Sequence, residues 1–166
     1  MKEVCMQIKE LGHLAFKCRD LKASVAFYRD VLGFTPKFSL YYGDRVDYLR
    51  KTGGNEDAVA QYLPRYRDPW IVYMQISERQ FIELFDPEGA DQNCVPNWRC
   101  LNYQHLALVV EDIHAAREEL SSKGIPIDTE PSFGMEGTWQ MWIHDPDGNM
   151  IEFMQYTPNS MQLTGR

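Results

Sequence analysis

The hydrophobic and polar positions of the chain follow one pattern twice. Residues 12–33 (GHLAFKCRDLKASVAFYRDVLG) and 104–124 (QHLALVVEDIHAAREELSSKG) each place a histidine at the head of a short apolar strand. An aspartate follows seven residues later, and a stretch with helical spacing then ends at a glycine. Asp20 and Asp112 suit helix N-caps, and the closing glycines suit the left-handed position after a helix. The chain therefore predicts an internal repeat of strand and helix.

Extended segments with alternating apolar residues are expected after each predicted helix. In chain order they are 36–42, 45–50, 71–76 and 80–86 in the first half, then 125–128, 138–144 and 149–156 in the second. The segment 52–70, with a Gly-Gly pair and two prolines, is expected to be a long connection, a candidate specificity loop or lid. The second half has no counterpart to it.

This order of elements predicts an α+β fold made of paired βαβββ modules. We expect a single domain over residues 1–166, because a chain of this length supports one hydrophobic core. Within it we expect module one, a linker, module two and a loosely held C-terminal tail. These predicted parts are residues 8–86, 87–101, 102–156 and 157–166, respectively.

Composition excludes several classes of function. The net charge is −7 and the basic residues are scattered, so the chain lacks the positive field that a nucleic-acid partner requires. Charges interrupt the N-terminal stretch MKEVCMQIKE, and no later run is apolar enough for a membrane span. We therefore expect a cytoplasmic protein whose partner is a small molecule.

Two histidines and two glutamates stand at matching places in the two halves. His13 and His105 each open an apolar strand, and Glu83 and Glu152 each lie among large apolar neighbours near the end of their half. A buried carboxylate is costly unless it is paired or coordinated. Lys17 is the one well-placed cation on these faces, and one cation cannot balance two glutamates. We therefore predict that the two histidines and two glutamates bind one divalent metal.

The sequence leaves the identity of the metal and the role of the residues around it open. Two imidazoles and two carboxylates suit Zn, Ni, Co, Mn or Fe(II). Several apolar side chains near the glutamates are expected either to line a substrate cavity or to belong to the ordinary core. These are Phe81, Phe85, Trp139, Met150 and Met154. His114 and His144 are expected to have structural roles.

With these residues in place, the chain resembles the vicinal oxygen chelate superfamily. That family includes lactoylglutathione lyase, methylmalonyl-CoA epimerase, extradiol dioxygenases and fosfomycin- and bleomycin-resistance proteins. The motifs that carry the resemblance are GHLAFKCRDLKASVAFYRDVLGF, FIELF, YQHLALVVEDI and DPDGNMIEF, within residues 12–156. The resemblance implies an incompletely closed mixed β-barrel around a metal, and a homodimer. Lactoylglutathione lyase is similar to this chain in its His, Glu, His and Glu pattern, whereas the dioxygenases and thioltransferases use two histidines and one glutamate.

The resemblance also implies a reaction. The implied enzyme is a lyase or isomerase that acts on a small substrate with adjacent oxygens through an enediolate. Glu152 is the first candidate for the catalytic base, and Glu83 is the second. Lys17 stands where the lyases carry an arginine near the glutathione carboxylate, but Pro87 replaces their usual asparagine. The segment PSFGMEGTW also lacks the expected basic residue. A sugar-like, hydroxyketone or other small oxygenated substrate is therefore expected as readily as glutathione. For the class of function, the alternatives to a lyase or isomerase are an epimerase, an Fe(II) dioxygenase and a non-catalytic binding protein.

Overall fold

The chain divides into two compact units, residues 1–88 and 89–166. The computed structural model describes residues 8–94, 96, 99, 101 and 103–165. Each unit contains a four-stranded mixed sheet, and the two sheets share one strand topology. This confirms the predicted α+β fold of repeated modules. Within the described ranges, no helix combines the length and apolar character needed to cross a membrane.

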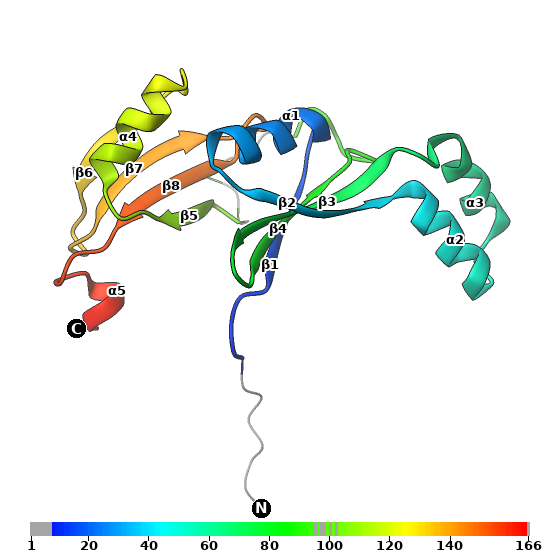
Figure 1. The fold of residues 1–166 in the computed structure, drawn as a ribbon, viewed down its shortest axis with the longest axis horizontal. Coiled ribbons are helices and arrows are strands. Elements are labelled where there is room, and N and C mark those ends of the chain that lie inside the picture. Colours follow the sequence, from blue (N-terminus) through cyan, green and yellow to red (C-terminus); the bar gives the residue numbers. More distant parts are fainter. Residues whose placement is uncertain (1–7, 95, 97–98, 100, 102, 166) are drawn as a thin grey trace, which may run out of the picture. The chain divides into compact units, whose positions relative to one another are not determined.

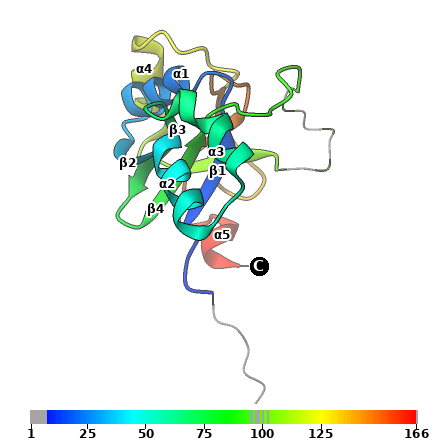
Figure 2. The same cartoon turned by 90° about the vertical axis from the view of Figure 1, so that its right-hand side faces the viewer.

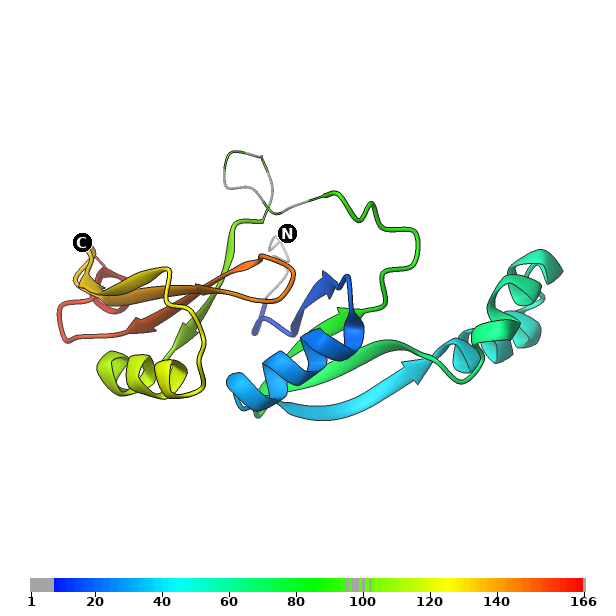
Figure 3. The ribbon, with the colours of Figure 1, turned by 90° about the horizontal axis from the view of Figure 1, so that it is seen from above.

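The first unit is a βαβββ module with a helical insertion (Figures 1 and 3). Its elements are β1 (His13–Lys17), α1 (Leu21–Ala26), η1 (Phe27–Val31), β2 (Thr35–Tyr41), α2 (Tyr42–Thr52), α3 (Glu56–Tyr62), η2 (Leu63–Arg65), β3 (Pro69–Ser77) and β4 (Gln80–Phe85). The sheet order is β1-β4-β3-β2, with β1 parallel to β4 and the other pairs antiparallel. The helices α2 and α3 form a hairpin that extends beyond the sheet where β2 ends and β3 begins, and this hairpin faces the viewer in Figure 2.

The second unit repeats the module without the insertion. Its elements are β5 (His105–Val109), α4 (Ile113–Ser122), β6 (Thr129–Phe133), β7 (Trp139–His144), β8 (Met150–Gln155) and a short α5 (Met161–Thr164). The order β5-β8-β7-β6 reproduces that of the first sheet, and β5 is again parallel to β8. The helix α4 lies along the sheet (Figure 1).

The predicted helix ends are confirmed in both modules. The Asp20 carboxylate accepts a hydrogen bond from a first-turn backbone N–H at 3.0 Å, and the Asp112 carboxylate accepts two, at 2.9 and 3.1 Å. Gly33 and Gly124 have φ values of 73° and 72°, a conformation that side chains with a Cβ disfavour. The first helix finishes in a π-helical turn, which the sequence pattern did not predict.

Alternation along the strands gives each sheet one apolar face and one face that carries a glutamate. The apolar face packs against the helices of its own module and forms its core. Buried residues of the first core include Phe16, Tyr28, Met74, Ile82 and Leu84. Buried residues of the second include Ile113, Leu120, Met141, Ile143 and Ile151. The opposite faces remain available for chemistry.

The prediction of a strand at 45–50 is wrong, because these residues lie within α2. The Asp44 carboxylate accepts a hydrogen bond from the Tyr41 backbone N–H at 2.7 Å and so caps the helix N-terminus. Gly53 ends the helix in the left-handed conformation. The capping signal decides the structure, although the apolar positions alone also fit strand alternation.

Two further segment predictions need correction. The segment 52–70 is largely helical, since it contains α3 and η2. Asn55 starts α3 by accepting a hydrogen bond from the Asp57 backbone N–H at 2.7 Å. The strand predicted at 125–128 lies instead at β6, immediately after it. In both segments the helix or strand begins at a residue that caps the helix or pairs with the neighbouring strand, and not at the first apolar residue.

The helical insertion has its own small core. Tyr42, Val46, Val59 and Tyr62 are buried together, and Leu49, Ala58 and Trp70 pack against them. Gly43 permits close packing, because a Cβ there would lie 2.7 Å from the Tyr66 ring. The insertion is thus a packed helical hairpin rather than an open loop.

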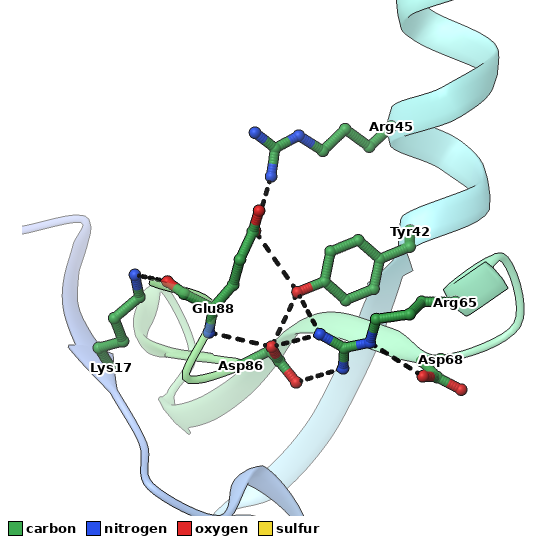
Figure 4. A network of polar contacts seen from close by, with 7 residues as sticks. All are labelled: Lys17, Tyr42, Arg45, Arg65, Asp68, Asp86 and Glu88. Atoms are coloured by element: carbon green, nitrogen blue, oxygen red, sulfur yellow. Dashed lines mark hydrogen bonds and ion pairs between the residues drawn. The ribbon is translucent and has the colours of Figure 1, made fainter. Parts of the chain in front are cut away.

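A polar network fastens this hairpin to the chain just after β4 (Figure 4). Both terminal nitrogens of Arg65 donate to the Asp86 carboxylate, at 2.9 and 2.7 Å, and the Tyr42 hydroxyl donates to it at 2.8 Å. Arg45 donates to the Glu88 carboxylate at 2.9 Å. The Arg65 guanidinium holds the pKa of Asp86 below its ordinary value, against the effect of burial. The charge of Asp86 is therefore satisfied by the hairpin.

The C-terminal segment is tied down, contrary to the loosely held tail that we predicted. The Ser160 hydroxyl is buried, donates to the Gly137 carbonyl at 2.9 Å and accepts from the Thr157 backbone N–H at 2.8 Å. The Thr138 hydroxyl donates to Ser160 at 3.0 Å. These bonds hold the start of α5 against the turn before β7.

Candidate metal centre

The first module places one histidine beside one glutamate. Ala15 of β1 lies opposite Glu83 of β4, so His13, two residues before Ala15, faces the same side of the sheet. The distance from His13 Nε2 to Glu83 Oε2 is 3.5 Å. The Cys18 backbone N–H donates to the Phe85 carbonyl at 2.9 Å and extends the parallel pairing past this pair. Glu83 is buried, whereas about half of the His13 side chain is exposed.

The second module repeats this arrangement with the same register. Ala107 of β5 lies opposite Glu152 of β8, and His105 is again two residues before it. The distance from His105 Nε2 to Glu152 Oε2 is 3.3 Å. The Val110 backbone N–H donates to the Met154 carbonyl at 2.8 Å, in the position of the equivalent bond in the first module. Two independent sheets therefore hold the same pair in the same way.

Histidine is the basic partner that the structure gives each of the two carboxylates. Among the described residues, no lysine or arginine forms an ion pair with Glu83 or Glu152. Burial raises the pKa of Glu152 above its ordinary value; the His105 imidazole opposes this rise, and Glu136 adds to it. A raised pKa marks a carboxylate whose charge is incompletely compensated by the protein.

The separations within the pairs suit a divalent metal. Two ligand atoms about 2.1 Å from one ion, at angles between octahedral and tetrahedral, lie about 3.0–3.4 Å apart. The observed separations of 3.3 and 3.5 Å are close to this range. They exceed the ~2.8 Å of a charge-assisted hydrogen bond. In the described part of the chain, no three His, Cys, Asp or Glu side chains gather in one group that could hold a metal ion.

An aromatic ring stands across from each glutamate, and sequence reasoning missed both rings. Tyr73 of β3 lies opposite Glu83, and Trp142 of β7 lies opposite Glu152. The Trp142 ring meets the His105 ring edge-on with centroids 4.9 Å apart, and Tyr73 meets the imidazole of its own module at 6.2 Å. Pairing each penultimate strand antiparallel with the last one would have revealed these positions.

Four of the predicted substrate-binding residues share the faces of the glutamates. Phe81 and Phe85 flank Glu83 on β4. Met154 is buried on β8, on the face of the other glutamate. Lys17 ends β1 on the Glu83 face, and its ammonium donates to the Glu88 backbone carbonyl (Figure 4). The structure thus places these four side chains beside the predicted ligands.

Trp139 does not share the face of Glu152, which corrects its predicted place in a cavity wall. It pairs with Gln155 on β8, whose side chain accepts from the Ile113 backbone N–H at the start of α4. The Trp139 ring therefore belongs to the helix-covered face, whereas Trp142, three residues further along β7, lies opposite Glu152. A shift of one residue along a strand reverses the face.

The remaining histidines lie outside the two pairs. The His114 ring meets the Trp139 ring edge-on, with centroids 5.3 Å apart. His144 Nδ1 lies 2.5 Å from the Asp128 carboxylate at an exposed position. Both contacts agree with the structural roles we expected.

With the fold and both pairs described, comparison with known proteins identifies the family. The model of the Glyoxalase/Bleomycin resistance protein/Dioxygenase superfamily matches residues 10–153. The chain belongs to this superfamily. The match covers both modules and all four predicted ligands.

The individual relatives have low sequence identity to this chain. The chain is 30% identical over 148 residues to a probable lactoylglutathione lyase from Synechocystis, covering 87% of this chain and 94% of that protein. It is 31% identical over 153 residues to the uncharacterised protein YwkD from Bacillus subtilis, covering 90% and 99%. The crystal structure of lactoylglutathione lyase from Agrobacterium tumefaciens matches with a TM-score of 0.59 and 20% identity, covering 90% and 96%. The last likeness concerns the fold alone.

Proposed function

We propose that the protein is a divalent-metal-dependent lyase or isomerase of the glyoxalase type, acting on a small substrate with adjacent oxygens. The observation that carries this proposal is the repeated pair of histidine and buried glutamate, built at the same register in both modules. The fold itself does not require a histidine beside a buried glutamate in either module. The lactoylglutathione lyase named among the relatives supports the same class of reaction.

In this proposal, His13, Glu83, His105 and Glu152 hold the metal together. Two ligands alone bind a divalent ion weakly, so both pairs are needed on one ion. A bound ion would supply Lewis acidity to the adjacent oxygens of the substrate. The donor set admits Zn, Ni, Co, Mn or Fe(II).

The protein's own residues then carry the proton. Glu152 takes the proton from the carbon beside the carbonyl group and returns it to the neighbouring carbon, which isomerises the substrate. Glu83 is the second candidate for this step. Met154 beside Glu152, and Phe81 and Phe85 beside Glu83, limit the access of water, so each carboxylate exchanges its proton with the substrate rather than with solvent.

Elemental analysis of the purified protein tests the metal centre. We expect about one metal ion per chain in the wild type and loss of most of it in His13→Ala and Glu83→Gln. His144→Ala is a matched control, because His144 also contacts a carboxylate but lies outside the proposed centre. That variant should retain the metal.

Other outcomes would favour other functions. Metal retained in Glu83→Gln but lost in His13→Ala would indicate a three-ligand centre, as in the dioxygenases, and oxygen uptake would then be measured. Wild-type protein without metal would contradict the proposal and favour a non-catalytic binding protein. With metal present, α-hydroxycarbonyl compounds are the substrates to screen.

The proposal includes a homodimer, the commonest soluble assembly. Sedimentation of the wild type measures this directly. Mixing His13→Ala with His105→Ala then asks which chains supply the two pairs: recovered metal binding in the mixture would mean that one centre draws its pairs from two chains.

A further inference from the structure

The most exposed aromatic side chain on the Glu83 face of the first sheet is Phe38. It lies on β2, the edge strand, and registers opposite Tyr73. The two rings stack with centroids 4.2 Å apart and planes 19° from parallel, while 48% of Phe38 remains exposed. An apolar ring held in this way presents a flat surface to whatever occupies the face. We call Phe38 and Tyr73 the aromatic shelf.

The shelf begins at the predicted metal ligands. Tyr73 lies directly opposite Glu83, and its ring meets the His13 ring edge-on at 6.2 Å. Because Phe38, Tyr73 and Glu83 are successive partners across three strands, their side chains project from the same face. A molecule bound at the ligand pair would reach the shelf with its next few atoms.

The second module shows that the fold does not require an aromatic ring at this position. There, Trp142 stands opposite Glu152 as Tyr73 stands opposite Glu83. Its partner on the edge strand, however, is Thr129 rather than a phenylalanine. The same topology thus forms with a small polar residue in place of the exposed ring, so packing alone does not explain Phe38.

The other in-register positions on this face are mainly apolar. Leu40 and Ile71 pair with each other, and Ile71 pairs with Phe85. Among the paired strand positions on this face, the cation is Lys17, which already donates to a backbone carbonyl. A peptide such as glutathione, with charged groups at both ends, matches this surface poorly, whereas a flat apolar group matches it well.

We propose that the aromatic shelf binds a planar, apolar part of the substrate, so that the enzyme acts on aryl-substituted compounds with adjacent oxygens. This inference rests on the proposed function, because it places the reacting oxygens at the ligands of the metal. The shelf stacks on the planar group, while the adjacent oxygens lie at His13 and Glu83 of the same face. It makes Phe38 a specificity-determining residue.

Calorimetric titration of the zinc-loaded protein with mandelate and with lactate tests the shelf. The two acids have the same hydroxyl and carboxylate oxygens and differ in a phenyl or a methyl substituent. We expect the wild type to bind mandelate about fivefold or more tighter than lactate, the scale of one aromatic stack. Phe38→Ala should remove this preference, and Phe38→Leu, which keeps an apolar side chain, should remove most of it.

Phe133→Ala is the matched control. Phe133 also lies on an edge strand, β6, is 56% exposed and contacts one aromatic ring, but it lies on the face of Trp139. This variant should keep the wild-type preference. Equal affinities in the wild type, or a preference that survives in Phe38→Ala, would overturn the shelf while the metal centre stands.

Two further results would also overturn the shelf. A wild type that binds none of the five admitted metals would refute the proposed function, and the shelf with it. A wild-type dimer that Phe38→Ala converts to a monomer, with the preference for mandelate unchanged, would show that a second copy covers the ring. Sedimentation of both proteins alongside the titrations distinguishes this case.

Discussion

The salt bridge between Arg65 and Asp86 offers a sharp test of how the helical insertion is held. Asp86 follows β4 directly, and its side chain is 10% exposed. Arg65 donates hydrogen bonds to both of its carboxylate oxygens. Asp86→Asn keeps the shape of the side chain and one acceptor oxygen but removes the charge. Arg65 then loses its buried anionic partner and keeps its ion pair with the exposed Asp68.

We expect Asp86→Asn to lower the free energy of unfolding by about 2–3 kcal/mol. Hydrogen bonds to charged groups contribute about 1.5–3 kcal/mol each, and the partial exposure of Arg65 reduces the total. For a chain of this length, the loss corresponds to a fall of about 4–12 °C in the melting temperature. Calorimetry at pH 7 measures it.

The pH dependence supplies a second readout. Since Arg65 lowers the pKa of Asp86 in the folded state, the unfolded state binds more protons in the acid range. The stabilisation is complete above the ordinary aspartate pKa of about 4 and is lost as the pH falls through the lower folded value. The difference between wild type and Asp86→Asn should therefore be constant from pH 5 to 8 and shrink below about pH 4.

The control is a bidentate pair of the same chemistry on the surface of the second unit. Arg117 donates to both oxygens of Glu130 at 2.9 and 2.8 Å, and both side chains are exposed. Glu130→Gln should leave the melting temperature unchanged. Equal effects of the two substitutions, or a difference for Asp86→Asn that persists at pH 2.5, would refute the reasoning.

Three further substitutions test other contacts. Trp142→Ala should weaken zinc binding about tenfold in a competition titration, whereas Trp142→Phe, which keeps a ring against the imidazole, should retain most of the affinity. Gly43→Ala should cost about 1–3 kcal/mol in urea unfolding, because the new Cβ would lie 2.7 Å from the Tyr66 ring. Ser160→Ala should cost about 1–3 kcal/mol in the same assay, because it removes the hydroxyl that bonds the Gly137 carbonyl.

The internal repeat made most of the fold predictable from the sequence. Asp20 and Asp112 cap the helices as their positions implied, since a cap depends only on residues a few positions apart. The insertion was mispredicted because its apolar positions fit both a strand and a helix, and the Asp44 cap decides between them.

Residue type and strand alternation together predicted part of the candidate site. His13 and Glu83 came together because a buried carboxylate on an apolar strand requires a partner. Tyr73 and Trp142 were missed, since they carry no charge and acquire meaning only through the register of β3 and β7. Trp139 was misplaced for the same reason: composition identifies an aromatic side chain, but only strand pairing tells which face it joins.

The two modules share their ligand pair and differ around it, which separates two tasks in the proposed enzyme. Glu152 lies in the module where burial raises the pKa of the carboxylate and where the edge strand carries Thr129 opposite Trp142. Phe38 and the helical hairpin belong to the other half. Since a repeat begins as two equal copies, these departures mark where each copy acquired its own role. Substitutions near Glu152 should therefore change the rate of the chemical step, and substitutions at Phe38 should change which substrates are accepted.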